Sequence, residues 1–380
     1  MNTLTGIDVL LNDPFQPLRG LRVGLLTHLA ATDRHLRTTY ERFASGATGA
    51  KLSALFAPEH GMAGAEQDGV AIETHNDPLS GVPIYSLYGA SNRPTPEMFE
   101  GLDVLVCDLV DVGVRYYTFL WTLSHVLEAA GTADLPVYIL DRPNPQGGRV
   151  AGRGLDTRFA SLVGRYDVPI LHGLTLGEMA QYLNGVHNPT PAELHVIACA
   201  NWRHEVRFEQ TGLIWIAPSP NMPTLATALH YGGACWLEGT TLSEGRGTTL
   251  PFQVVGAPFM DAYKLAQHLN RQAWAGVAFR PHVFKPLASK YAGEVCYGVQ
   301  VHITDPRHYD PLSVWLGVIH ALKRAYSEQI QWLPHFDLLM GTDEVRLQLE
   351  AGTRPDDILL EWQSYAHDFA RRRADFLLYD

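Results

Sequence analysis

A glutamate and a histidine stand side by side where a short apolar run ends. The stretch "ALFAPEHG" covers residues 54–61, and its last four residues are Pro58, Glu59, His60 and Gly61. A carboxyl group next to an imidazole can donate and accept protons, which is the chemistry of general acid–base catalysis. A loop glutamate beside a histidine and a glycine has no obvious capping role, so we interpret Glu59 as a functional residue.

Two further apolar runs end in polar clusters. The run "LDVLVCDLV" leads into "DVGVRYYTF", and the run "LPVYILDRP" leads into an Asn-Pro turn. Because the carboxyl ends of parallel strands meet at one edge of a sheet, these side chains are expected to share a rim with Glu59. The residues concerned are Asp108, Asp111, Gly113, Arg115, Tyr116 and Tyr117 in the first cluster and Asp141, Arg142 and Asn144 in the second.

These clusters also have structural interpretations. Asp141 and Arg142 could pair and hold the proline turn, and Asp108 could accept backbone N–H bonds at the end of its strand. In "HGLTLGEMAQYLNG", the T-x-x-E pattern that ends at Glu178 is typical of a helix capping box, which makes this glutamate structural. His172 precedes the box and is expected to be freer to touch a ligand.

The most unusual segment is the Gly/Thr-rich stretch over residues 219–252. "SPNMPT" places Asn221 in a stiff, proline-flanked turn, and "EGTTLSEGRGTT" carries Glu238, Glu244 and Arg246 along a loop. This loop has no lysine and does not match the phosphate-binding pattern G-x-x-x-x-G-K-[ST]. Arg246 suits a carboxylate or a phosphate through a bidentate fork. The alternative is that Arg246 pairs with Glu244 or Glu238 and shapes the loop.

The apolar runs around these clusters predict an α/β fold. Val/Leu-rich runs alternate with helical patterns, which is typical of a parallel sheet covered on both faces. The pattern over residues 119–131 predicts a helix with Gly131 as its cap. The sheet is Rossmann-like, but no G-x-G-x-x-G follows its first strand, so a dinucleotide is not expected. We expect no cofactor. We expect a Rossmann-like catalytic domain over residues 1–255 and a smaller α/β domain over 256–380.

Composition narrows the classes of protein. The 380 residues include 40 acidic and 29 basic side chains, and the net charge is −11. Lysines and arginines are scattered and form no stripe, which argues against a nucleic-acid partner. No run approaches the roughly 18 apolar residues of a membrane span. The N-terminal residues lack the features of a secretory signal, so a cytoplasmic location is expected, or a periplasmic or secreted one if the protein has been processed.

Together, the motifs resemble those of one enzyme family, formerly known only as a domain of unknown function. "APEHG", "DVGVRYYTF", "DRPNPQGG", "HGLTLGE", "SPNMPT" and "EGTTLSEGRGTTLPFQVVGAP" are similar to the signature of the exo-β-N-acetylmuramidases, in order along nearly the whole chain. The resemblance implies a glycoside hydrolase that removes β-1,4-linked N-acetylmuramic acid from the non-reducing end of peptidoglycan fragments, in muropeptide recycling. It also implies an active-site cleft between a Rossmann-like domain and a smaller α/β domain.

The sequence departs from the family pattern in two places. The first strand of such proteins usually continues as Thr-Asn, whereas Thr27 is followed here by His28, which puts a ligand contact from that loop in question. Many members also carry an export signal that this sequence does not show. Its substrate is therefore expected to be soluble, imported muropeptides.

The resemblance gives the candidate residues their roles. Glycosidic cleavage needs a proton donor for the leaving oxygen and, opposite C1, a carboxylate, an activated water or the sugar's own 2-acetamido oxygen. Glu59 is expected to be the general acid, because its apolar neighbours favour the protonated carboxyl, and His60 either orients it or touches the sugar. Glu244 is expected to be the second carboxylate, with Glu238 and Asp111 in reserve. Retaining, inverting and substrate-assisted mechanisms all stay open.

Muramic acid carries a lactyl carboxylate, which predicts an arginine in the site. Arg115 and Arg246 are the two candidates for this contact, and the two tyrosines beside Arg115 offer faces on which a sugar could stack. A homodimer stays open. The full set of expected substrate contacts is Asp111, Arg115, Tyr116, Tyr117, His172, Asn221, Glu238 and Arg246.

Two other classes of protein compete with a glycosidase. A metal-dependent hydrolase could use His60, Asp108, Asp111 and His172 as ligands, although the sequence lacks an H-x-x-x-H or similar pair. A non-catalytic sugar-binding protein would keep the aromatic residues and arginines without needing Glu59. A chromogenic muramic acid substrate separates all three interpretations.

Overall fold

The structure is a computed structural model that describes residues 2–63, 75–89 and 92–380. Its contacts divide the chain into two compact units. Unit 1 consists of residues 1–149, 172–223 and 371–380, and unit 2 consists of residues 150–171 and 224–370. Each compact unit is therefore made of segments that are separated in the sequence, and neither unit is one continuous stretch of chain.

Unit 1 is built on a seven-stranded sheet in the order β3-β4-β2-β1-β5-β6-β7. Only β3 is antiparallel to its neighbour, and the other described pairs are parallel. This confirms the predicted α/β class. The strands are β1 (Arg22–Thr27), β2 (Lys51–Ala57), β3 (His75–Asn76), β4 (Pro83–Ser86), β5 (Val104–Asp108), β6 (Val137–Leu140) and β7 (Leu194–Ile197).

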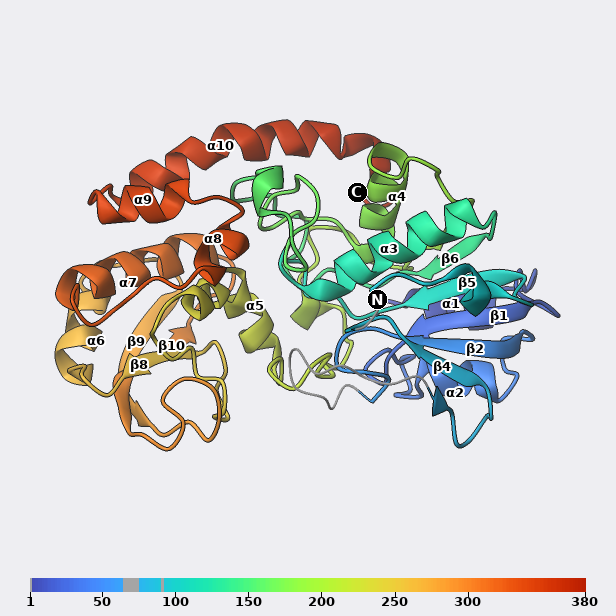
Figure 1. The fold of residues 1–380 in the computed structure, drawn as a ribbon, viewed down its shortest axis with the longest axis horizontal. Coiled ribbons are helices and arrows are strands. Elements are labelled where there is room, and N and C mark those ends of the chain that lie inside the picture. The colour runs from blue at the N-terminus through green and yellow to red at the C-terminus, as the bar shows by residue number, and fades with distance from the viewer. Residues whose placement is uncertain (1, 64–74, 90–91) are drawn as a thin grey trace. The chain divides into compact units, whose positions relative to one another are not determined.

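Helices cover the sheet of unit 1, as the Val/Leu-rich strands require. One buried cluster joins α1 and α2 to alternate residues of β1, β2 and β5, so these two helices share a face of the sheet. Helices α3 and α4 contact each other, and Figure 1 shows both lying over the sheet. Their bounds are α1 (Gly6–Asn12), α2 (Thr39–Ala44), α3 (Thr118–Thr132) and α4 (Leu176–Val186), with 3-10 turns at Pro96–Phe99, Phe208–Gln210 and Ala374–Phe376.

The helix predicted over residues 119–131 is α3, but Gly131 does not cap it. The helix continues to Thr132, and Ala133 is its C-cap. A Cβ atom on Gly131 would lie 1.9 Å from the carbonyl oxygen of Thr190. The glycine is therefore needed for close packing against the loop that contains Thr190. Local sequence patterns do not predict this contact.

The order of the strands creates a crevice at the carboxyl end of β1. The chain continues from β1 to β2 on one side, and later adds β5 on the other side of β1. Ligands of open α/β sheets bind outside the carboxyl ends of the strands at such a point. The loops that follow β1, β2, β5 and β6 carry the polar clusters found in the sequence.

Unit 2 contains a three-stranded antiparallel sheet in the order β8-β10-β9. The boundary expected between residues 255 and 256 lies within β8, inside unit 2. The strands are β8 (Val254–Ala257), β9 (Val277–Phe284) and β10 (Cys296–Ile303), and the helices are α5 (Leu225–Ala234), α6 (Ala262–Asn270), α7 (Pro311–Ala325), α8 (His335–Met340), α9 (Glu344–Glu350) and α10 (Pro355–Arg372), with 3-10 turns at Thr157–Phe159 and Cys235–Gly239.

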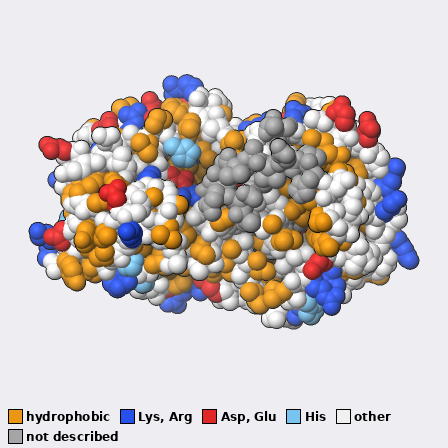
Figure 2. Space-filling model, turned by 60° about the horizontal axis from the view of Figure 1, so that its bottom comes forward, with side chains coloured by type: hydrophobic (Ala, Val, Ile, Leu, Met, Phe, Trp, Pro, Cys, Tyr) orange, Lys and Arg blue, Asp and Glu red, His pale blue; other side chains and the backbone are white. Residues whose placement is uncertain are grey.

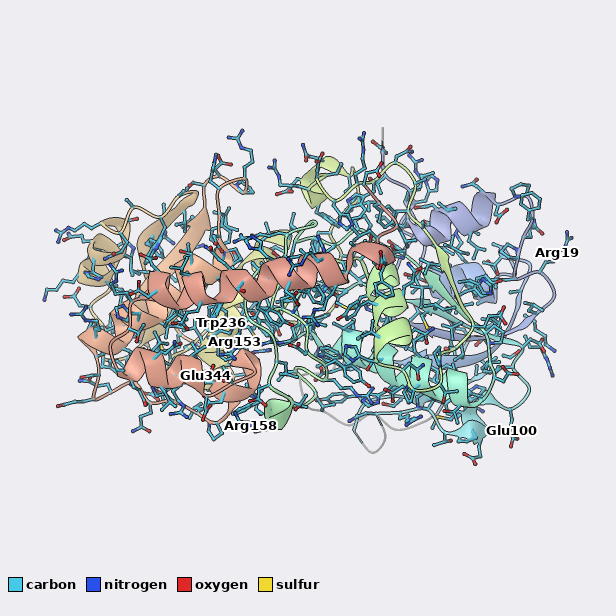
Figure 3. The ribbon with its side chains drawn as sticks, turned by 90° about the horizontal axis from the view of Figure 1, so that it is seen from above. Arg19, Glu100, Arg153, Arg158, Trp236 and Glu344 are labelled. Atoms are coloured by element: carbon cyan, nitrogen blue, oxygen red, sulfur yellow. The ribbon has the colours of Figure 1, made fainter. Side chains whose placement is uncertain are left out.

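Residues 150–171 join unit 2 through polar contacts. Arg153 donates to the Glu344 carboxylate at 2.7 Å, and Figure 3 labels both near Trp236. The Tyr365 hydroxyl of α10 donates to Asp167 at 2.7 Å. Residues 371–380, in contrast, return to unit 1, where the Tyr379 hydroxyl donates to Asp141 at 2.6 Å.

Charged side chains are spread over the surface. On the face drawn in Figure 2, the acidic and basic side chains of the described residues stand in small separate groups. This matches the scattered lysines and arginines of the sequence. None of the helices in the described part of the chain combines the length and the hydropathy that a membrane crossing needs.

Candidate active site

Glu59 follows the buried end of β2 in a tight turn. The backbone N–H of Gly61 donates to the carbonyl of Pro58 at 3.1 Å, and both His60 and Gly61 adopt positive φ angles, of 70° and 73°. A residue other than glycine is uncommon in this region, and such strain is often found at functional sites. The turn holds Glu59 and His60 buried at the rim of the sheet.

The first residue of α3 fixes the carboxyl group of Glu59. Thr118 Oγ1 donates a hydrogen bond of 2.6 Å to Glu59 Oε2. The N-cap of this helix, Tyr117, makes no capping hydrogen bond through its side chain. A hydroxyl side chain at the start of a helix often accepts a hydrogen bond from a backbone N–H of the first turn. The Thr118 hydroxyl instead donates to the carboxyl group of Glu59 and orients it.

A group of aromatic rings surrounds this corner of unit 1. Phe119 is fully buried, and its ring centroid lies 4.8 Å from Tyr117, 5.0 Å from His28 and 6.4 Å from His60. The structure therefore brings the predicted residues Glu59, His60 and Tyr117 together. We call this set, together with Thr118, the Glu59 corner.

Three of the predicted substrate contacts are less accessible in the structure than the sequence suggested. They are Arg115, Tyr116 and Tyr117. All three side chains are buried, and Arg115 is not exposed at all. The Arg115 carbonyl accepts a hydrogen bond of 2.8 Å from the indole of Trp121. Both tyrosine rings are buried in this structure, so sugar stacking on them would require the rings to be uncovered.

His28, at the position where the sequence departs from the family pattern, has a structural partner. Its Nε2 atom accepts a hydrogen bond of 3.0 Å from the backbone N–H of Val110. Burial, together with the nearby Arg142 and His60, lowers the pKa of His28 to about 3, so the ring is neutral. His28 ties the loop after β1 to the loop after β5, a role that sequence reasoning missed.

The expected pairing of Asp141 with Arg142 is wrong, because each residue has another partner. Arg142 forms a bidentate ion pair with the buried Asp108, at 2.8 Å between Nη2 and Oδ2, and also donates to the Thr32 carbonyl at 3.0 Å. Asp108 thus binds a guanidinium, not the backbone N–H groups suggested by its position. The pair joins the loops after β1, β5 and β6.

Asp141 belongs to a buried network of its own. Its carboxyl accepts hydrogen bonds from Thr175 Oγ1 at 2.7 Å and from the Gly177 N–H at 2.8 Å, besides the hydroxyl of Tyr379. Burial raises its pKa to about 6. The predicted capping box is confirmed beside it, since Glu178 accepts from the Thr175 N–H at 2.8 Å.

His172 is buried within unit 1 and is less accessible than the sequence suggested. Its Nδ1 atom accepts a hydrogen bond of 3.2 Å from the Leu174 N–H, and burial lowers its pKa to about 3. Within the described residues, Nε2 of this ring has no hydrogen-bond partner. Asn221 lies, partly buried, in a turn that the Met222 N–H closes by donating to the Ser219 carbonyl at 3.0 Å.

A pocket lies in unit 1 where the loops after β1, β5 and β6 meet residues 208–216. Its cavity volume is about 100 Å3, smaller than the roughly 300–1,000 Å3 of sites that enclose a drug-sized ligand. Most of its wall is apolar, and Trp215 and Phe208 pack edge to face at 5.4 Å. The polar part of the wall includes Asp111, Arg142 and Asn144.

Asp111 is the most perturbed carboxyl of this pocket. Its Oδ2 atom accepts from the Gly113 N–H at 2.6 Å, whereas its buried Oδ1 atom has no hydrogen-bond partner among the described residues. Burial raises the pKa of Asp111 to about 7. A strongly perturbed group in a pocket is a candidate functional residue.

In unit 2, the predicted residues Glu238, Glu244 and Arg246 do lie together. Arg246 Nε donates to Glu238 Oε1 at 2.7 Å, stands 3.8 Å from Glu244, and places its guanidinium over the ring of Phe252 at 5.0 Å. The structural alternative, in which Arg246 pairs with a neighbouring glutamate, therefore describes this loop. Any substrate carboxylate would compete with Glu238 for the guanidinium.

The partner of Glu244 is a lysine that the sequence analysis did not single out. Lys290 Nζ donates to Glu244 Oε2 at 2.9 Å and to the carbonyls of Leu237 and Leu242 at 2.8 and 2.9 Å. The three protons of the ammonium thus have three acceptors. We call Glu238, Glu244, Arg246 and Lys290 the Glu244 cluster.

The four residues considered as metal ligands do not form a ligand set in unit 1. Asp108 binds Arg142, and Nδ1 of His172 accepts from a backbone N–H. Across the described ranges, no group of three or more His, Cys, Asp or Glu side chains is arranged to hold a metal ion.

Family models cover nearly the whole chain. The models described as "Exo-beta-N-acetylmuramidase NamZ, N-terminal" and "Exo-beta-N-acetylmuramidase NamZ, C-terminal" match residues 23–226 and 229–379. The chain belongs to the exo-β-N-acetylmuramidase NamZ family. This confirms the resemblance found in the motifs. The two family models meet between residues 226 and 229, close to residue 224, where the chain enters unit 2 for the second time.

Individual relatives agree with this membership. The chain is 39% identical over 378 residues to the peptidoglycan beta-N-acetylmuramidase NamZ of Bacillus subtilis strain 168, which covers 99% of this chain and 91% of that protein. Two crystal structures of DUF1343 family proteins from Bacteroides fragilis NCTC 9343 are also similar. One has a TM-score of 0.92 at 36% identity and the other a TM-score of 0.81 at 28% identity, and each comparison covers 100% of this chain and 99% of the other.

Proposed function

We propose that this protein is an exo-acting glycoside hydrolase that removes β-1,4-linked N-acetylmuramic acid from the non-reducing end of peptidoglycan fragments. The observation that carries the proposal is the full-length relationship, at 39% identity, to a peptidoglycan beta-N-acetylmuramidase. We further propose that the fragments are muropeptides released during turnover of the cell wall.

Glu59 is the proposed general acid. Its side chain is buried at the carboxyl end of β2, and Thr118 fixes one oxygen of its carboxyl group. A protonated carboxyl in this position can give its proton to the glycosidic oxygen as the bond to C1 breaks. His60, in its positive-φ conformation beside Glu59, is the proposed orienting residue.

The proposed group opposite C1 is Glu244, with Glu238, which binds Arg246, and Asp111 in reserve. Glu244 is held by Lys290 in unit 2, and Asp111 stands in the pocket of unit 1 with one carboxyl oxygen that lacks a partner among the described residues. In a substrate-assisted reaction the acetamido oxygen attacks C1, and a carboxyl such as Asp111 would hold the amide N–H. Arg115 and Arg246 remain the proposed readers of the lactyl carboxylate.

The direct test is release of the aglycone from a chromogenic β-N-acetylmuramic acid substrate by the purified protein, without added metal. Activity that survives a chelator is expected. Loss of activity with a chelator and its recovery with zinc would favour a metallohydrolase instead. Tight binding of the substrate with no turnover would favour a sugar-binding protein.

A further inference from the structure

A groove lies in unit 2 between α6, α7 and the start of α10. Besides α7, its wall contains Lys264, Leu265 and His268 of α6, Gln272 and Trp274 of the following turn, and residues 354–356. It shares no residue with the Glu244 cluster. Figure 1 shows α6 and α7 beside each other within this unit.

The side of α7 that faces the groove has an unusual composition. Gly317, His320, Ala321 and Arg324 line it at helical spacing, so they form one stripe of the helix. The stripe is small and polar, whereas the opposite side of α7 is buried through Trp315, Val318, Ile319 and Leu322. A stripe of this kind leaves room for a ligand above the helix rather than for another apolar element.

Trp274 forms an aromatic wall of the groove. A Cβ atom on Gly317 would lie 2.2 Å from Cζ2 of the indole, so the missing side chain is what allows the ring to lie against α7. Trp274 is only partly buried, and its ring also packs against Phe279 at 5.8 Å. A partly exposed indole in a concave site is a suitable surface for the C–H face of a pyranose ring.

The groove also contains polar groups that are ready to bind. Arg324 is exposed and makes no ion pair within the described residues, whereas Lys264 is paired with Asp261 and Arg354 with Asp357. Nε2 of the partly buried His320 has no hydrogen-bond partner in the same part of the chain. Buried polar atoms of this kind are satisfied by a bound water or by a ligand.

We propose that this groove is a second, non-catalytic site that holds a glycan strand of the substrate polymer. Trp274 would stack against a sugar ring, His320 and Gln272 would hydrogen-bond to hydroxyl groups, and Arg324 would bind a carboxylate of the lactyl group or the peptide stem. The inference rests on the proposed muramidase function, because that function supplies a polymer of acidic, N-acetylated sugars. The site raises the local concentration of the polymer and leaves the chemical step unchanged.

The experiment compares two substrates in variants of the groove. Arg324→Glu and Gln272→Ala change exposed side chains, and Trp274→Ala removes the ring. Lys285→Glu is the matched charge reversal, since Lys285 is exposed and lies outside the groove. We expect KM for long glycan strands to rise about two- to tenfold in the groove variants, as for the loss of one stacking or charged contact. Hydrolysis of the chromogenic monosaccharide should match the wild type, and Lys285→Glu should change neither.

Two outcomes in the groove variants would overturn the proposal. If all groove variants keep the wild-type KM for glycan strands, or lose activity on both substrates in parallel, the groove is not a glycan site. If the wild type hydrolyses neither substrate, the proposed function fails on its own. Co-sedimentation with insoluble peptidoglycan, stripped of attached polymers, then still tests the groove: wild-type protein should bind and Arg324→Glu should bind at least twofold less.

Discussion

The Glu59 corner and the Glu244 cluster each present a buried glutamate, but they surround it with different partners. Glu59 accepts a hydrogen bond from the neutral hydroxyl of Thr118 and lies among aromatic rings. Glu244 accepts from the ammonium of Lys290 and stands 3.8 Å from Arg246. The same residue type therefore has an uncharged partner in unit 1 and cationic partners in unit 2.

The difference shows how partners assign roles to carboxyl groups. A hydroxyl can remain hydrogen-bonded to a carboxyl whether or not the carboxyl is protonated, because it can both donate and accept. An ammonium can only donate, and Lys290 directs its protons to Glu244 and to two carbonyl groups. This contrast is the reason to test the proposed acid and the proposed second carboxylate separately.

The largest expected effect is that of Glu59→Gln on catalysis. The amide keeps the shape and a hydrogen bond to Thr118 but has no acidic proton, so kcat should fall by about 10²- to 10⁴-fold with KM within a few-fold. Glu100→Gln is the matched control on the surface of unit 1, where Figure 3 labels Glu100, and should leave kcat unchanged. An activated leaving group departs without a proton donor, so Glu59→Gln should retain more turnover on it than Glu244→Gln; the opposite order would mean that the two roles are exchanged.

The second prediction asks which unit reads the lactyl carboxylate. Loss of one charge-assisted hydrogen bond should lower kcat/KM for muramic acid substrates by roughly ten- to a hundredfold, and should spare the weak activity on the glucosamine analogue. We expect this of Arg246→Ala or of Arg115→Ala. Glu238→Gln is the informative companion, because it frees Arg246 from its ion pair and should strengthen the preference if Arg246 is the reader. Unchanged discrimination in both arginine variants would rule out the arginine hypothesis.

The third prediction concerns the stability of the Glu244 cluster. Lys290→Met removes the ammonium and leaves the buried Glu244 and two carbonyl groups without that partner. Since the lysine side chain is 21% exposed, part of the charge can be solvated, and we expect a loss of about 1–3 kcal/mol in the free energy of unfolding. Urea denaturation measures it. Lys264→Met breaks an exposed pair of the same kind and should have no measurable effect; equal losses in both variants would contradict the comparison.

The smallest expected effect is the pH dependence contributed by Asp111. Its pKa is raised from 3.8 to about 7 in the folded protein, so the folded state holds the proton more tightly than the unfolded chain. Stability from this group is fully present below pH 4 and is lost as the pH rises to about 7. Asp111→Asn should remove this slope, gaining on the order of 1 kcal/mol relative to the wild type between pH 5 and pH 8. A parallel pH profile of the two proteins would show that the carboxyl is solvated.

The parallel sheet could be predicted because a buried strand leaves a local signature. Runs such as "VLVCD" are apolar on both faces, and β5 indeed has every residue buried. The capping box at Thr175 and Glu178 was equally visible, since its two residues are three positions apart. Apolar runs and capping boxes involve residues close together in the sequence, so they can be recognised without knowledge of the tertiary fold.

The contacts within the candidate site join residues that are far apart in the sequence. Thr118 binds a glutamate 59 residues away, Lys290 binds one 46 residues away, and Arg142 finds Asp108 rather than its neighbour Asp141. The division into units could not be predicted from the order of the sequence either. Residues 150–171 belong to unit 2 although segments of unit 1 flank them, and residues 371–380 belong to unit 1 although they follow unit 2. The side chains were identified from chemistry, but their partners depend on long-range packing.

The return of residues 371–380 to unit 1 has a consequence for synthesis of the protein. Asp141 obtains Thr175 and Gly177 soon after it leaves the ribosome, but its third partner, Tyr379, lies 238 positions further along the chain. The Leu378 N–H, which donates to Glu178 at 2.9 Å, arrives equally late. Until then, two buried carboxyl groups of unit 1 lack part of their hydrogen bonding, while all of residues 224–370 is made in between. Unit 1, most of which is translated before residue 224, therefore cannot complete these hydrogen bonds until the last residues of the chain have been made.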